Sequence, residues 1–204
     1  MSRMEPRIGR VLVASLHQAI ADVLPDRLEF YENWLNAPGL REGTIGLAPL
    51  SAVLSFLRLE GEAYNRTTAV AGEYAADWSV SSMSTFERRV IAALPMRLRT
   101  RGALRAAAAL VRATYPGSRV VVRVRRGVAS VDLRGSLFCE VREATPSPLC
   151  GFYAAAIARV LYQFGIRAEA QVSECRAASR GKGCRLNVEV LGARSNDGEP
   201  AAAA

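Results

Sequence analysis

The sequence predicts an α+β domain in which a helical N-terminal half packs on one face of an antiparallel sheet. Apolar residues recur at helical spacing as far as Ala113, and at Arg119 the period changes to two. Two dipeptides that suit tight turns, Arg126-Gly127 and Arg134-Gly135, follow. Runs of helices followed by runs of strands are typical of this layered class. We expect a single domain over 1–192, mainly helical over 1–117 and sheet plus helix over 118–192.

Chain length and apolar content also suit one domain. The chain has 204 residues, half of them hydrophobic, which is enough to bury a core. It has no apolar run of about 18 residues, which argues against a membrane span. Val11–Leu24 is interrupted by polar residues and reads as an amphipathic helix rather than a signal peptide. We therefore expect a cytoplasmic protein with reduced thiols.

Charge leaves two interpretations open. The formal net charge is +8, and Lys182 is the only lysine among the basic residues. Enrichment in both arginine and alanine is typical of a GC-rich genome; the alternative is binding to an anionic surface. Aromatic residues are not interleaved with the arginines as a base-stacking platform requires, and no helix-turn-helix or zinc-finger pattern occurs. The sequence therefore argues against nucleic acid as the partner.

Helical spacing and breaker residues define the elements of the N-terminal half. Pro25 ends the first helix, Asp26 caps the second, and a loop with a Pro-Gly pair and further glycines occupies 36–46. The segment after Leu59 continues as helix, the cap at Ser82–Ser84 starts another, and Pro95 kinks or restarts it. The expected helices are Ile8–Val23, Asp26–Trp34, Leu47–Leu59, Glu60–Trp78, a short helix after Ser84, and Leu98–Ala113.

Alternation defines the strands of the C-terminal half. Valines alternate with arginines after Arg119, as in a half-buried strand. Apolar residues without alternation after Cys150 predict a helix that Gly165 ends. We expect a disordered polar tail over 193–204. The expected order is β-β-β-α-β-β, with strands at Arg119–Arg125, Val128–Leu133, Ser136–Arg142, Ala168–Cys175 and Cys184–Val190 and a helix at Cys150–Phe164.

Three cysteines are the most informative residues. Cys150 starts the predicted helix, and Cys175 and Cys184 stand on the two legs of the last hairpin. A helix start and two hairpin legs can meet in space, and three thiols at one point suggest a metal site or a reactive pocket. Cys139, on the preceding predicted strand, could join them. Each cysteine alone is more often a small core residue.

These residues carry a resemblance to a known family. Cys150-x-Phe152 opens an apolar helix, Glu174-Cys175 and a Gly-containing loop follow, and Cys184 begins the last strand. This arrangement resembles the 4-vinyl reductase domain family over roughly residues 118–191. The resemblance implies a fold shared with TRAPP vesicle-tethering subunits and haem NO-binding proteins. The family includes an accessory protein of bacteriochlorophyll synthesis and the sensor domains of phenol-responsive activators.

The resemblance also implies zinc. In those sensors three cysteines and a glutamate hold the ion, and the cysteines fall here on Cys150, Cys175 and Cys184. The glutamate position is Val172 in this chain, which is a departure from the family pattern. A closed zinc site needs a fourth donor, either Cys139 or Glu174. Neighbouring residues of a strand point to opposite faces, so Glu174 points away from Cys175 and we favour Cys139.

The sequence argues against an enzyme. It has no Ser-His-Asp set, phosphate loop or dinucleotide fingerprint, and it has one histidine. We therefore assign no catalytic residues. We predict a small-molecule-binding or regulatory protein of the 4-vinyl reductase type. An accessory role in bacteriochlorophyll (tetrapyrrole) synthesis and a TRAPP-like dimeric scaffold without ligand are the alternatives.

The predicted ligand is an apolar small molecule. We expect a cavity bordered by the Leu47–Leu59 helix, the Cys150–Phe164 helix and the inner sheet face. Its predicted lining residues are Phe56, Phe152, Tyr153 and Tyr162. The helix around Phe56 leaves almost no polar face, and a helix that is apolar all round is buried. We therefore also predict a homodimer that pairs through the N-terminal helices.

Overall fold

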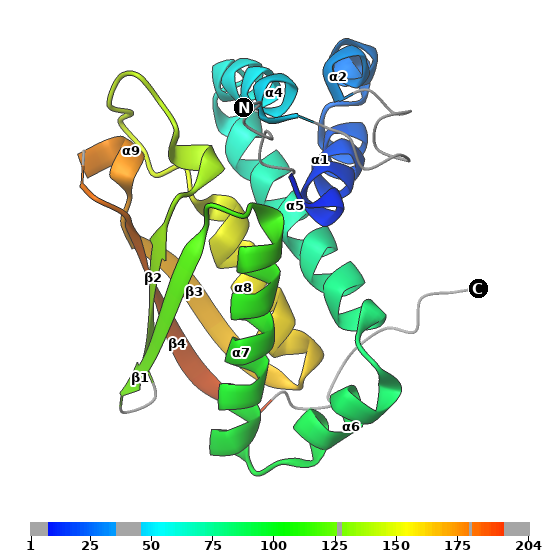
Figure 1. Cartoon of the computed structure of the whole chain (residues 1–204), viewed down its shortest axis with the longest axis vertical. Helices are drawn as coiled ribbons and strands as arrows, with labels where there is room; N and C mark the ends of the chain where they lie inside the picture. Colours follow the sequence, from blue (N-terminus) through cyan, green and yellow to red (C-terminus); the bar gives the residue numbers. More distant parts are fainter. Residues whose placement is uncertain (1–7, 36–45, 126–127, 180, 194–204) are drawn as a thin grey trace, which may run out of the picture.

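A four-stranded antiparallel sheet lies on one side of the molecule and the long helices lie on the other (Figure 1). The computed structural model describes residues 8–35, 46–125, 128–179 and 181–193. The turn at Arg126-Gly127 lies outside these ranges, as do all but the last residue of the loop predicted at 36–46 and all but the first residue of the tail predicted at 193–204. Ala193 is the last residue of β4. In order, the elements are α1 (Arg10–Val23), η1 (Pro25–Arg27), α2 (Leu28–Leu35), α4 (Leu47–Leu59), α5 (Glu62–Ser82), α6 (Thr85–Ala93), α7 (Met96–Thr114), β1 (Arg119–Arg125), β2 (Val128–Arg134), η2 (Leu137–Cys139), α8 (Gly151–Gln163), β3 (Ile166–Glu174), α9 (Arg176–Ser179) and β4 (Cys184–Ala193).

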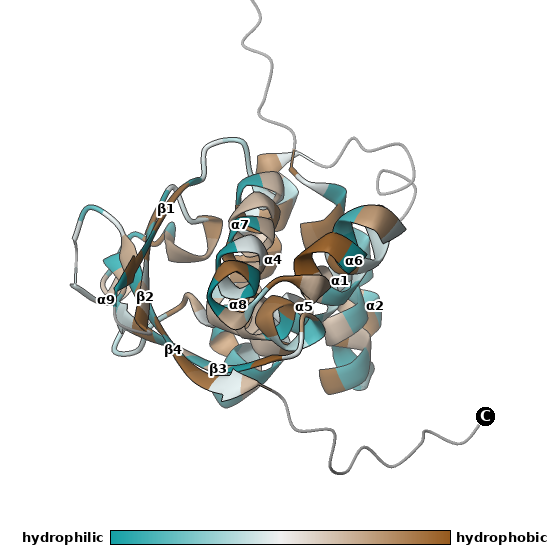
Figure 2. Ribbon diagram, turned by 90° about the horizontal axis from the view of Figure 1, so that it is seen from below, coloured by the Kyte–Doolittle hydropathy of each residue, from teal (hydrophilic) through white to brown (hydrophobic). Residues whose placement is uncertain are grey.

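The helices form two layers over the sheet. The strand order is β1-β2-β4-β3, with every neighbouring pair antiparallel. Seen from below, the sheet curves around α7 and α8, and α5 and α1 lie on the side of those helices that faces away from the sheet (Figure 2). α8 packs against α5, α7 and β3, and α5 packs against α1. The predicted α+β class, with a helical half on an antiparallel sheet, is confirmed.

Side-chain alternation follows the predicted period of two. On β4, Cys184, Leu186 and Val188 are buried, and the residues between them are exposed. The buried set faces the helices and forms part of one continuous core. The opposite face of the sheet is polar and rich in arginine, as expected for a sheet with one solvated side.

The predicted strand at Ser136–Arg142 is wrong. This segment contains η2 and irregular backbone instead. β2 pairs with β1 along one edge and with β4 along the other, so no free edge remains beside it. Gly135, at φ 72°, turns the chain away from the sheet, in a left-handed conformation that glycine adopts readily. Cys139 therefore reaches the core from a short 3-10 turn.

The helix expected to continue from Leu59 is a separate element. Gly61 has a φ of 62° and interrupts the helix between α4 and α5. α5 then runs to Ser82, beyond the predicted end at Trp78. The predicted cap is confirmed at Ser84, whose hydroxyl accepts a hydrogen bond from the amide of Glu87 at 3.1 Å.

Helices α5 and α8 cross at very close range. Gly72 is buried on α5, and a Cβ there would collide with the carbonyl oxygen of Phe152 and come within 3.0 Å of the amide of Ala156. Buried Ala71, Ala75 and Ala76 surround it on α5. This crossing fixes the first turn of α8 against the core. No helix among the described residues has the length and apolar character needed to cross a membrane.

Gly72→Ala should therefore destabilise the protein, even though alanine normally stabilises a helix by about 1 kcal/mol relative to glycine. The new methyl meets backbone that has no free space, and overpacking of this kind costs about 1–3 kcal/mol. Gly102→Ala on α7 is the matched control, because its Cβ would meet only the Ile91 side chain, at 3.2 Å. Urea unfolding of both variants measures the difference. Equal or greater stability of Gly72→Ala would contradict the assigned crossing.

Candidate metal centre

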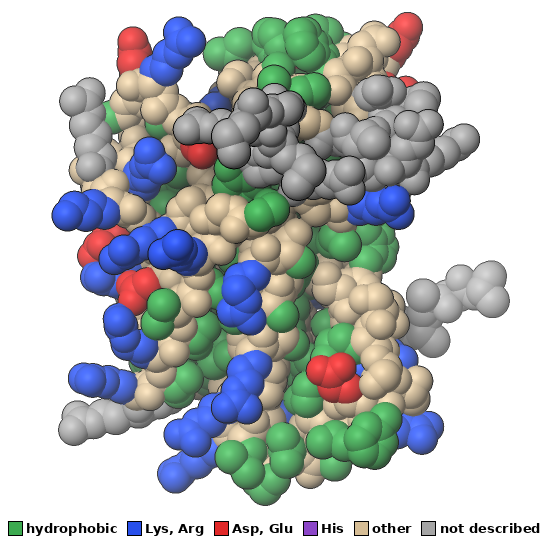
Figure 3. All heavy atoms as spheres, in the orientation of Figure 1, with side chains coloured by type: hydrophobic (Ala, Val, Ile, Leu, Met, Phe, Trp, Pro, Cys, Tyr) green, Lys and Arg blue, Asp and Glu red, His purple; other side chains and the backbone are tan. Residues whose placement is uncertain are grey.

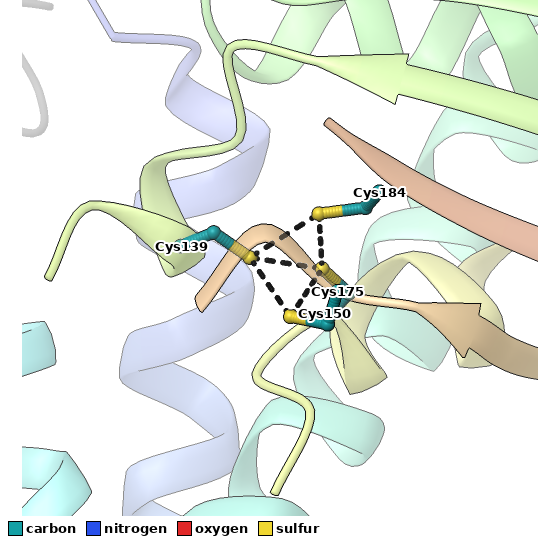
Figure 4. A group of neighbouring side chains, drawn as sticks. All are labelled: Cys139, Cys150, Cys175 and Cys184. Carbon is teal, nitrogen blue, oxygen red and sulfur yellow. Dashed lines mark hydrogen bonds between the residues drawn. The ribbon is translucent and has the colours of Figure 1, made fainter. Parts of the chain in front are cut away.

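Four thiols from four separate segments meet at one buried point (Figure 4). Cys139 ends η2, Cys150 directly precedes α8, Cys175 lies between β3 and α9, and Cys184 begins β4. Their Sγ atoms all lie within 4.8 Å of one another, and no side chain of the four is more than 4 % exposed. The convergence that the sequence suggested, with Cys139 as the fourth member, is present in the structure.

Local structure places Cys150 and Cys184. Cys150 is the N-cap residue of α8, and its carbonyl accepts the amide hydrogen bonds of Tyr153 and Ala154. The preceding carbonyl, that of Leu149, accepts the hydroxyl of Tyr64 at 3.1 Å. Cys184 pairs with Leu133 of β2, so the sheet register fixes its inward direction.

The other two cysteines lie in irregular backbone. The β3–β4 ladder has a register shift between Val172 and Glu174, and its last pair, Glu174 with Arg185, directly precedes Cys175. The carbonyl of Cys175 then accepts amide hydrogen bonds within α9, from Ala178 at 3.0 Å and Ser179 at 2.8 Å. On the opposite side, Arg58 of α4 donates to the carbonyl of Phe138 at 3.1 Å and so anchors η2 beside Cys139.

The sulfur positions approximate a tetrahedron. Sγ of Cys139 lies 2.9 Å from that of Cys150, 3.5 Å from Cys175 and 3.4 Å from Cys184. Sγ of Cys150 lies 3.6 Å from Cys175 and 3.0 Å from Cys184. Four sulfurs bound to one zinc ion at about 2.3 Å lie about 3.8 Å apart. A movement of a few tenths of an ångström to somewhat under 1 Å per pair would therefore admit the ion.

Backbone groups favour thiolates at two of these positions. The amide of Leu149 donates to Sγ of Cys175, and the amide of Arg176 donates to Sγ of Cys184, each at 3.4 Å. Hydrogen bonds from the thiol of Cys139, assisted by Cys150, lower the pKa of Cys175 and of Cys184. Hydrogen bonding to Cys139, together with burial, raises the pKa of Cys150. The four thiols therefore titrate as one interacting group.

The glutamate considered as an alternative fourth donor lies outside the cluster. Glu174 is exposed and forms an ion pair with Arg185 at 2.6 Å on the outer face of the sheet. Val172, at the position of the family's glutamate, pairs with Leu186 in the ladder. Among the described residues that could ligate a metal, the group at this point consists of the four cysteines.

The predicted ligand residues lie in three different places. Phe152 and Tyr153 are fully buried and contact the ring of Phe138, with centroids 4.9 Å and 5.5 Å away. Phe56 packs on the rings of two aromatic residues of α2. Tyr162 lies under the guanidinium of Arg159, 5.2 Å from it. Two of the four therefore support the cysteine cluster by packing beside it.

The elements around the predicted cavity also differ from those expected. α7 and α8 cover the inner face of the sheet, whereas α4 packs against α2 and α5 (Figure 1). The small gap between α7, α8 and the strands has no room for a water molecule; it is lined by Leu104, Ala107, Ala108, Val111, Val120, Val122, Val131 and Ile157. An open apolar hollow of about 250 Å³ lies instead between α5, α6 and α7, lined by Val80, Met83, Ala106 and Leu110 among others.

Sequence reasoning did not identify Arg58 or Tyr64 as supports of the cluster. Both lie on helices far from the cysteines in the chain, and each acts by donating one hydrogen bond to a backbone carbonyl. An arginine or a tyrosine on an apolar helix carries no local signal of such a partner. Only the tertiary packing of α4 and α5 brings them to η2 and to the start of α8.

Fold and site together define a class: an α+β domain with helices on one face of a four-stranded antiparallel sheet and a closed set of four buried thiols. No family model and no curated protein matches this chain. Among solved structures, it is similar to an Fe(II) unliganded H-NOX protein from K. algicida, with 12% identity, a TM-score of 0.53 and coverage of 95% of this chain and 100% of that one. At this identity the similarity shows a shared fold.

Two further solved structures give lower scores. The phenol-responsive sensory domain of the transcription activator PoxR, with phenol, has 15% identity and a TM-score of 0.49, covering 71% of this chain and 74% of that one. A trafficking protein particle complex subunit 3 from Naegleria fowleri, covalently bound to palmitic acid, has 11% identity and a TM-score of 0.48. That similarity covers 90% of this chain and 99% of that one.

Proposed function

We propose that the protein is a regulatory domain that binds a small apolar molecule and is held together by zinc at the four-cysteine cluster. The cluster is the observation that carries this proposal. Four thiolates fill the tetrahedral sphere of zinc and leave no open position for water or substrate. The ion would therefore have a structural role, joining η2, the start of α8 and the two ends of the β3–β4 connection.

The small-molecule part of the proposal has separate support. The fold is shared with an H-NOX protein described by its Fe(II) ligation state, and the cysteine pattern resembles the 4-vinyl reductase family. The apolar hollow between α5, α6 and α7 is the candidate binding place, because it is open and lined mainly by apolar side chains. An accessory role in bacteriochlorophyll synthesis rests on the family resemblance alone.

A dimeric scaffold is a second candidate, favoured by one surface. Phe30 and Trp34 of α2 are 39% and 40% exposed, and Leu59 at the end of α4 is 82% exposed. Phe56 lies between the two helices, with its ring centroid 5.3 Å from that of Phe30 and 5.5 Å from that of Trp34. A contiguous patch of exposed aromatic and apolar groups is typical of an interaction surface.

Zinc should be present at about one ion per chain in protein purified without chelator or added metal. Cys139→Ala should remove it as completely as Cys184→Ala, and each should lower the melting temperature by roughly 5–15 °C, because metal binding is then part of the folding free energy. Glu174→Gln is the control and should keep both the zinc and the stability. Elemental analysis and calorimetry measure these quantities. Retention of zinc by Cys139→Ala, or its loss from Glu174→Gln, would refute the assigned ligand set.

Ligand binding should appear as a dose-dependent rise in melting temperature in a screen of phenols, fatty acids and porphyrins, since a ligand that prefers the folded state stabilises it. Ala106→Trp fills the α5–α6–α7 hollow and should abolish the rise. Ala92→Trp, at an exposed site on α6, should leave it unchanged. If no class of compound raises the melting temperature, the scaffold candidate becomes the better one.

Light scattering at micromolar concentration should give twice the chain mass if the aromatic surface of α2 and α4 pairs two copies. Trp34→Glu should convert the dimer to a monomer, because a buried unpaired carboxylate is costly. Phe86→Glu on α6 is the matched control, since Phe86 is 78% exposed at a distance from α2 in the fold (Figure 1). A wild-type monomer would exclude pairing through this surface.

A further inference from the structure

Strand β1 is an edge of the sheet, and a groove separates it from α7. β1 pairs with β2 on one side only, so alternate main-chain N–H and C=O groups along its seven residues point toward the open edge. The groove measures about 370 Å³, and its floor consists of Val120, Val122 and Val124 of β1 with Leu104 and Ala108 of α7. It combines an unpaired strand with apolar side chains.

Arginines lie on both sides of the free edge of β1, one row on α7 and one on the outer face of the sheet. Arg101, Arg105 and Arg112 line the groove from α7, where their spacing places all three on one helix face. Arg119, Arg123 and Arg125 project from the outer side of β1 and are exposed. Figure 3 shows basic side chains over α7 and along the sheet at the left of the view. The unpaired edge therefore lies between two rows of positive charge.

The positive charge of this groove is largely uncompensated. No aspartate or glutamate is among its lining residues. Within the described chain, one of the six arginines has an ion pair, Arg123 with Asp132 at 2.6 Å. Arg101 and Arg105 are four residues apart on α7, a like-charge spacing that destabilises a helix by a few tenths of a kcal/mol.

We propose that this groove is a docking site for an extended acidic peptide segment of a partner protein, which adds to β1 as a fifth strand. Main-chain hydrogen bonds to the free edge of β1 would hold the segment. Alternate apolar side chains would lie over the valine floor, and the carboxylates between them would point to the outer face and meet the exposed arginines of β1. The arginines of α7 would add to the positive potential around the edge. The same arginines repel the β1 edge of a second copy, so the surface selects against self-pairing.

A polypeptide suits this surface better than a nucleic acid. Single-stranded nucleic acids bind where aromatic side chains offer stacking platforms, and no aromatic residue lines the groove. The free edge of β1 offers donors and acceptors at the repeat of a strand, and only another strand satisfies both along its length. Charge complementarity then requires the strand to be acidic.

The test uses the full chain and a fluorescent peptide of alternating glutamate and valine with the length of β1. Fluorescence polarisation at low salt should show saturable binding. The double variant Arg119→Glu/Arg125→Glu should weaken it about tenfold or more, because it places like charges against the glutamates of the peptide. Arg66→Glu/Arg89→Glu is the matched control, reversing two exposed arginines on α5 and α6, and should change affinity less than about twofold. Circular dichroism confirms that both variants fold.

Two N-methylated forms of the peptide test strand addition separately from charge. One carries methyl groups on the amides of the valines and the other on those of the glutamates, so charge is unchanged. A paired strand directs one of these sets at β1, and at least one form should bind about tenfold more weakly. Absence of saturable binding overturns the proposal. Equal binding of all three peptides, equal effects of the two double variants, or equally tight binding of an oligothymidylate of the same charge also overturns it.

Discussion

The meeting of four buried thiols is the constraint on which the C-terminal half depends. Cys139, Cys150, Cys175 and Cys184 come from four separate segments of the chain. Neighbouring thiols and the backbone amides of Leu149 and Arg176 lower the pKa of Cys175 and Cys184 and so favour thiolates there. A divalent ion would neutralise the charge that this arrangement favours, and its binding free energy would then stabilise the whole unit.

The helical N-terminal half supports this cluster through packing and hydrogen bonds. The close crossing at Gly72 seats the first turn of α8 on α5, which fixes Cys150. Hydrogen bonds from Arg58 and Tyr64 fix the backbone beside Cys139 and Cys150. The stacked rings of Phe138 and Phe152 fill the space between these two points. A substitution at the α5–α8 crossing should therefore disturb the geometry of the metal centre. Loss of the metal should in turn weaken the packing of α8 on α5.

Local signals made much of this predictable from the sequence. The change from helical to alternating period, the cap at Ser84 and the start of α8 at Cys150 all depend on neighbours in the chain. The competition between distant segments for the same packing partner was not predictable. Ser136–Arg142 has strand-like residues, but β4 occupies the edge of β2 that it needed. Phe56 lies on an apolar helix as expected, but α4 packs on α2 and α5, and nothing in its own sequence specifies that partner.

X-ray absorption at the zinc edge of the purified protein tests the central claim most directly. A single shell of about four sulfur atoms at about 2.3 Å is the predicted result, because all four cysteines would then be ligands. A shell of three sulfurs with one oxygen or nitrogen would contradict it, since it would exclude one cysteine and require a donor from outside the cluster. Protein that contains no metal would contradict it as well.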